Sequence, residues 1–129
     1  MTKLTELDTL FAMRGGGHMP ISTAANINSS GVLISSTNLN LLQLSDDKQN
    51  MSMGPGNRWF DVYSFLNATA PGITVVGGRL APVGVPGLLL GGGFSFYSYE
   101  YGMSSTNGNI LGYQVSHSQH IATSRLTIF

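Results

Sequence analysis

Glycine is gathered into a few runs of this chain, and these runs limit its folding more than any other feature. Two triplets, Gly15 to Gly17 and Gly91 to Gly93, interrupt apolar stretches. A glycine inside a helix costs about 1 kcal/mol relative to alanine, so a triplet needs a reason such as close approach of another backbone or of a flat ligand. The triplets therefore predict loops whose contacts are made by main-chain atoms.

The first half of the chain is typical of short strands separated by turns. Residues 10–13 predict a buried strand that runs directly into the first glycine triplet. Residues 32–35, 39–44 and 51–53 predict three more strands arranged as a meander, with an exposed turn at residues 46–48.

A helix is predicted next, because apolar residues recur at a helical period. Asn57 is the expected N-cap, and Pro71 with Gly72 is expected to end the helix. The residues of the apolar stripe are Trp59, Val62, Tyr63 and Leu66.

The second half predicts a further strand at residues 73–76, which runs into a second glycine-rich turn. An aromatic helix at residues 94–101 is expected to start from this glycine loop and to end at Gly102. Residues 110–115 predict one more strand. The expected class is α+β, with mixed sheets and a few packing helices.

Charge and hydropathy exclude several functions. Six basic and six acidic residues give zero net charge, so nucleic acid is not an expected partner. No apolar run reaches the ~18 residues that span a bilayer, so no membrane association is expected. The first nine residues lack the apolar core of a signal peptide, and localisation stays open.

The glycine turns are suited to holding a phosphate without help from basic side chains. Successive main-chain N–H groups in such a turn point into one concavity and bind an anion. Neither turn has the spacing of a Rossmann fingerprint or of a P-loop. Composition alone equally favours tight turns in a β-rich domain.

Three strings in this order resemble an FAD-binding domain of the vanillyl-alcohol oxidase type, the PCMH-type domain of berberine-bridge-like oxidoreductases. The strings are RGGGHMP at residues 14–20, GPGNRWFDVY at residues 54–63 and VGGRLAPVGVPGLLLGGG at residues 76–93. The resemblance implies that residues 1–115 form part of such a domain and that residues 116–129 diverge from it.

This resemblance implies a site for FAD. Gly15, Gly16, Gly17 and Met19 would surround the pyrophosphate, and His18 would bind the flavin ring covalently. Some relatives attach the ring a second time through a cysteine, but Leu80 stands at that position and the chain has no cysteine. The remaining implied cofactor contacts are Val83, Gly84, Val85, Gly87, Leu90, Gly91, Gly92, Gly93 and Asn107.

The implied function is FAD binding within an oxidoreductase that oxidises an alcohol or amine group of a small-molecule substrate. The sequence names no catalytic residue, and His117 with His120 makes a poor metal pair. Two alternatives remain: a truncated, non-catalytic fragment that retains no flavin, and a small secreted β-rich binding module.

Overall fold

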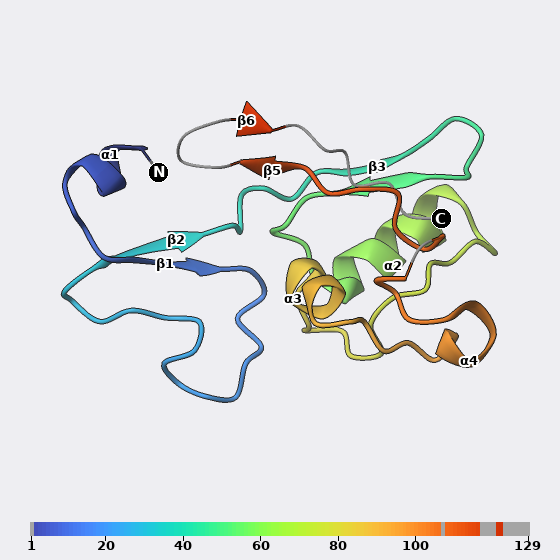
Figure 1. The fold of residues 1–129 in the computed structure, drawn as a ribbon. Coiled ribbons are helices and arrows are strands. Elements are labelled where there is room, and N and C mark those ends of the chain that lie inside the picture. Colours follow the sequence, from blue (N-terminus) through green and yellow to red (C-terminus); the bar gives the residue numbers. More distant parts are fainter. Residues whose placement is uncertain (1, 107, 117–120, 123–129) are drawn as a thin grey trace.

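The computed structural model describes residues 2–106, 108–116 and 121–122, and it confirms the α+β class (Figure 1). Within this part of the chain, one helix is followed by four strands, three helices and two further strands, and every element except α2 is short. In chain order they are α1 (Thr2–Glu6), β1 (Phe11–Arg14), β2 (Val32–Ser35), β3 (Leu42–Leu44), β4 (Met51–Met53), α2 (Trp59–Thr69), α3 (Val85–Leu90), α4 (Ser98–Tyr101), β5 (Val115–Ser116) and β6 (Ile121–Ala122).

The first two strands form a parallel pair, so the predicted meander is wrong at this point. Phe11 pairs with Val32 and Arg14 pairs with Ser35, and residues 15–31 form the connection. Strand β1 starts one residue later than predicted, and it is not buried, since Phe11 and Met13 are exposed. In Figure 1 this pair lies to the left of helices α2 and α3, so those helices do not cover it.

Strands β3 and β4 form the antiparallel hairpin that the sequence predicted. Leu42 pairs with Met53 and Leu44 pairs with Met51, while residues 46–48 form the exposed turn. Alternation explains the burial, because Met51 and Met53 point into the core and Ser52 points outward.

Helix α2 follows the predicted stripe, but its N-cap is Arg58 and not Asn57. The Arg58 N–H donates to Asp61 Oδ2 at 2.8 Å, which satisfies one donor of the first turn. The buried side chain of Asn57 instead donates to the carbonyl oxygens of Leu41 and Gly54. The helix ends at Thr69 with Ala70 as its C-cap, just before the predicted Pro71–Gly72 stop.

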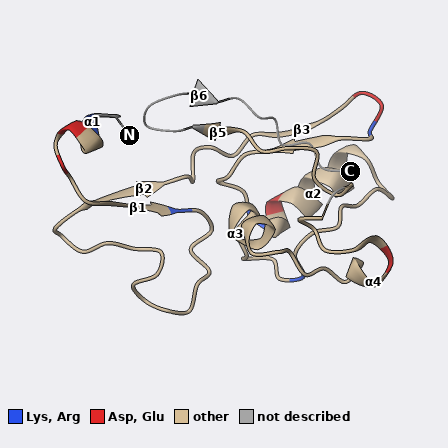
Figure 2. Cartoon of the chain, in the orientation of Figure 1, with Lys and Arg blue, Asp and Glu red and all other residues tan. Residues whose placement is uncertain are grey.

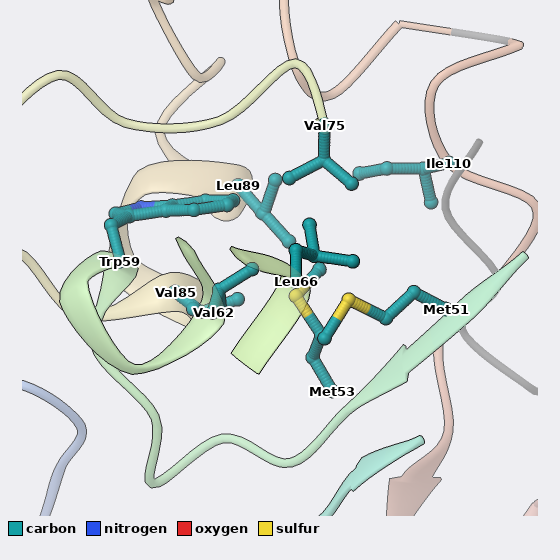
Figure 3. Close-up of a cluster of buried hydrophobic side chains, with 9 residues drawn as sticks. All are labelled: Met51, Met53, Trp59, Val62, Leu66, Val75, Val85, Leu89 and Ile110. Carbon is teal, nitrogen blue, oxygen red and sulfur yellow. The ribbon is translucent and has the colours of Figure 1, made fainter. Parts of the chain in front are cut away.

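The hydrophobic core lies between α2, α3 and the β3–β4 hairpin (Figure 3). Trp59, Val62 and Leu66 of the predicted stripe are buried, and Tyr63 is half-buried beside them. The core residues are Met51, Met53, Trp59, Val62, Leu66, Val75, Val85, Leu89 and Ile110.

Two predicted strands are not formed as expected. Residues 73–76 have no strand partner among the described residues; Val75 and Val76 are buried by side-chain packing, which gives a β-branched run without a sheet. Of residues 110–115, only Val115 belongs to a strand, β5, which pairs with β6. The side-chain amide of Asn109 binds the Tyr101 and Met103 carbonyls and holds the preceding chain in a turn.

The predicted aromatic helix is also wrong in its placement. The VPGLLL part of the third string forms α3 with Gly84 as its N-cap, so the glycine triplet follows a helix instead of opening one. Ser95 then turns the chain, because its N–H donates to Ser98 Oγ at 2.9 Å and to no helical carbonyl oxygen. Only the single turn α4 remains, and Gly102 caps it as predicted.

Candidate functional site

The first glycine loop, residues 15–19, leaves its main-chain donors available. It begins where β1 ends, and Gly17 adopts a left-handed conformation with φ of 66°. Within the described chain, no main-chain N–H of these five residues donates a hydrogen bond. His18 and Met19 are exposed, so the predicted anchor and its neighbour face solvent. The loop has the unsatisfied donors that an anion requires.

The second predicted glycine turn lies directly against the first. A Cβ added to Gly16 would stand 2.5 Å from both the N and the Cα of Gly84, and a Cβ on Gly84 would stand 2.4 Å from the N of Gly16. No real Cβ tolerates such distances, so both positions require glycine for main chain to meet main chain. The structure thus brings together Gly16 and Gly84, with Val83 and Val85 on either side.

Residues of the GPGNRWFDVY string hold the two turns together, and sequence reasoning gave them no such role. Gly84 forms an isolated antiparallel bridge with Arg58. On either side of that bridge, the Trp59 N–H donates to the Val83 carbonyl and the Val85 N–H donates to the Asn57 carbonyl, each at 3.0 Å. The Arg58 guanidinium also donates to the Gly16 carbonyl at 3.1 Å.

A buried hydroxyl supports the base of the first loop. Ser36 Oγ lies 3.1 Å from the Arg14 carbonyl oxygen and 2.9 Å from that of Pro55, so its single proton is shared between them. The Ser36 N–H donates to the same Arg14 carbonyl at 3.0 Å. No local signal in the sequence indicated this contact, since Ser36 and Pro55 lie 19 positions apart.

An open groove of about 610 Å³ adjoins the junction of the two turns. Its lining is polar and apolar in about equal parts, and Arg58 is its only basic residue within the described chain. Figure 2 shows that the acidic and basic residues are dispersed along the chain. The groove is lined by Gly15, Thr37, Asn40, Gly56, Asn57, Arg58, Phe60, Asp61, Ala81 and Pro82.

The second triplet lies at the other end of α3 from Gly84, about 9 Å along a six-residue helix. Gly92 and Gly93 have φ of 103° and 76°, and a Cβ on Gly93 would stand 2.5 Å from Cβ of Ser104. The Ser104 N–H donates to the Gly93 carbonyl at 2.7 Å. These contacts within the chain require glycine here, so a flat ligand is not needed to explain the triplet.

The other predicted cofactor residues are less constrained. Gly87 lies in α3 with open space where a Cβ would stand, and Leu90 is exposed at the end of the same helix. Asn107, His117 and His120 lie outside the described residues. Among the described residues, no three His, Cys, Asp or Glu side chains are grouped as a metal site would require.

The site is compatible with an anionic, phosphate-containing cofactor. Free N–H donors on an exposed glycine-rich loop suit a diphosphate, and the loop also has two cations nearby, since the Arg14 side chain lies beside Gly17 and the Arg58 guanidinium binds the Gly16 carbonyl. No described helix is long and apolar enough to cross a bilayer.

Comparison with known proteins identifies the family of this chain. A family model described as FAD binding domain matches residues 2–118. The FAD-dependent monooxygenase prx3 of Penicillium roqueforti is 45% identical over 113 residues, which cover 87% of this chain and 21% of that protein. The chain therefore spans about a fifth of that curated relative.

Solved structures show the same fold. Aclacinomycin oxidoreductase matches 97% of this chain and 25% of its own with a TM-score of 0.73 at 21% identity. The BBE-like 1 protein of Physcomitrella patens matches 97% of this chain and 32% of its own with a TM-score of 0.71 at 19% identity. The family match over residues 2–118 shows that this chain belongs to the FAD binding domain family, which the FAD-linked oxidoreductases above share.

Proposed function

We propose that residues 15–19 of this chain bind the diphosphate of FAD through their main-chain N–H groups. The observation that carries the proposal is that these donors have no acceptor within the described chain, although the loop is fixed at its base by Ser36 and against Gly84. A fixed loop with free donors binds an anion without first losing much conformational freedom.

We further propose that His18 attaches the flavin covalently. Its imidazole is exposed at the end of the loop and forms no hydrogen bond within the described chain. Such a bond would join an imidazole nitrogen to the methyl carbon at position 8 of the flavin ring. It would replace the imidazole N–H and one methyl C–H, and dioxygen would take up the two hydrogens as hydrogen peroxide. This chain contains no cysteine that could form a second bond to the ring.

The activity proposed for the protein as a whole is flavin-dependent oxidation of an alcohol or amine group in a small molecule. Bound flavin supplies the acceptor for a hydride from the substrate carbon, and the chemistry belongs to the cofactor. The residues of this chain bind and orient that cofactor. None of its described side chains is assigned as an acid or base toward substrate.

Acid precipitation of the FAD-loaded full chain tests both proposals. We expect yellow colour to stay with the precipitate of the wild type and to leave it in His18→Ala. His117→Ala is the matched control and is expected to keep the colour. A folded but colourless wild-type chain would contradict FAD binding, and colour that washes out of the wild type would contradict the covalent bond alone.

A further inference from the structure

We propose that Arg58 is a positioning residue that orients the diphosphate loop; this inference rests on the proposed binding of FAD by residues 15–19. The terminal nitrogen of its guanidinium donates to the carbonyl oxygen of Gly16 at 3.1 Å. The two residues are far apart in sequence, and this bond is the only side-chain hydrogen bond to the loop within the described chain.

The main chain of Arg58 is itself firmly held. It forms the bridge with Gly84, it caps α2, and its N–H is bound by Asp61. The next residue, Trp59, is completely buried in the core. The guanidinium therefore extends toward the loop from one of the best-fixed points of the molecule.

Binding of the Gly16 carbonyl has a direct consequence for the next N–H group. That carbonyl and the N–H of Gly17 belong to one planar trans peptide, in which the two groups point in opposite directions. No cis peptide interrupts the described chain. With its carbonyl held toward Arg58, this peptide directs the Gly17 N–H to the opposite face of the loop.

The anion is therefore expected on the face away from Arg58. The groove on the Arg58 side also contains the Asp61 carboxylate, which repels a diphosphate. Arg58 in this arrangement does not touch the cofactor: it acts through the peptide that it orients.

Titrations with three ligands test this role in the full chain. We expect Arg58→Met to weaken FAD and ADP binding about tenfold, as loss of one charge-assisted hydrogen bond does, and to leave riboflavin binding unchanged, since riboflavin has no phosphate. Arg58→Lys keeps a charge and a donor and is expected to restore part of the loss. Arg79→Met is the matched control, because Arg79 instead lies over the rings of Phe94 and Phe96.

A measurement without ligand separates this inference from the proposed function. In ¹⁵N relaxation of the free chain, we expect the Gly17 amide to become more mobile in both Arg58 variants while the amides of α2 stay unchanged. Absence of FAD binding by the wild type would overturn the proposed function. Unchanged Gly17 mobility, equal loss of FAD and riboflavin binding, or a partly unfolded Arg58→Lys chain would overturn the positioning role.

Discussion

At the level of single residues, the junction of the two glycine turns depends on the absence of side chains. Gly16 and Gly84 touch through main-chain atoms, whereas Gly87 has open space at the corresponding position. Glycine allows close packing of main chain at Gly16 and Gly84, whereas Gly87 makes no such contact. Of these three glycines, only Gly16 and Gly84 are required by packing.

We expect Gly16→Ala to lower the free energy of unfolding by about 1–3 kcal/mol, because the new methyl group overlaps the main chain of Gly84. Gly87→Ala is the control and is expected to raise stability by about 0.5–1 kcal/mol, since alanine favours the helix. Denaturant unfolding followed by fluorescence of the single Trp59 measures both. Equal unfolding midpoints for the two variants would contradict the close contact.

At the level of elements, α2 organises the molecule, since it contributes the centre of the core and its N-terminus meets both glycine turns. Tyr63 connects α2 to the segment before α3, because its hydroxyl donates to the Gly78 carbonyl at 2.8 Å. Burial, with a smaller contribution from Tyr97, raises the pKa of Tyr63 from 10.0 to about 12. The folded state therefore favours the neutral phenol.

This shift makes stability depend on pH in the alkaline range. The Tyr63 contribution is fully present below pH 10, where the phenol is neutral in both states, and it is lost as pH rises from about 10 toward 12. Tyr63→Phe is expected to cost about 1 kcal/mol at neutral pH for the lost hydrogen bond and to flatten the alkaline decline. Unfolding at pH 9 and pH 11.5 measures this.

The matched control for that prediction is Tyr99→Phe, because the Tyr99 side chain is 100% exposed. This variant is expected to retain the alkaline decline of the wild type. An equally steep decline in Tyr63→Phe would show that other groups cause it.

Elements whose hydrophobic pattern lies within their own residues were predictable from the sequence. The stripe at Trp59, Val62 and Leu66 and the β3–β4 hairpin are set by periodicity, which does not depend on distant residues. The partner of β2 was not predictable, because pairing of strands through a long connection depends on tertiary contacts. The Val75–Val76 run shows the same limit, since β-branched residues also serve packing without a sheet.

For the candidate site, the loops were predictable and their supports were not. Glycine runs mark the turns in the sequence, but nothing local indicates that Gly16 meets Gly84. The role of Arg58 depends on a contact across 42 positions, and no spacing rule covers such a distance. The requirement for Gly93 likewise comes from Ser104 and not from its own neighbours.

At the level of the whole molecule, one compact core coexists with much exposed apolar surface. Trp59 is completely buried by this chain alone, whereas the aromatic segment after the second triplet is not covered. Phe96 is 76% exposed, and its ring borders the Arg79 guanidinium. The parallel pair β1–β2 is also exposed on Phe11 and Met13, although parallel sheets are usually covered on both faces.

We expect the chain to bind a hydrophobic fluorescent dye in its folded state because of this surface. Phe96→Ser is expected to lower the dye fluorescence and to change the free energy of unfolding by less than about 1 kcal/mol, the size of an exposed cation–π contact. Asn67→Ser, at another exposed position, is the control. Dye binding that does not differ between the two variants would contradict a contribution from the aromatic segment.

The contact between Gly16 and Gly84 also restricts how such a chain can change over generations. A side chain gained at either glycine is not rescued by a second exchange at the other, because each is already the smallest residue and the clash is with the peptide itself. Compensation requires a shift of a whole loop. The two turns are therefore expected to evolve together. A chimeric chain that combines the first turn of one relative with the second turn of another would disturb the main-chain contact between Gly16 and Gly84.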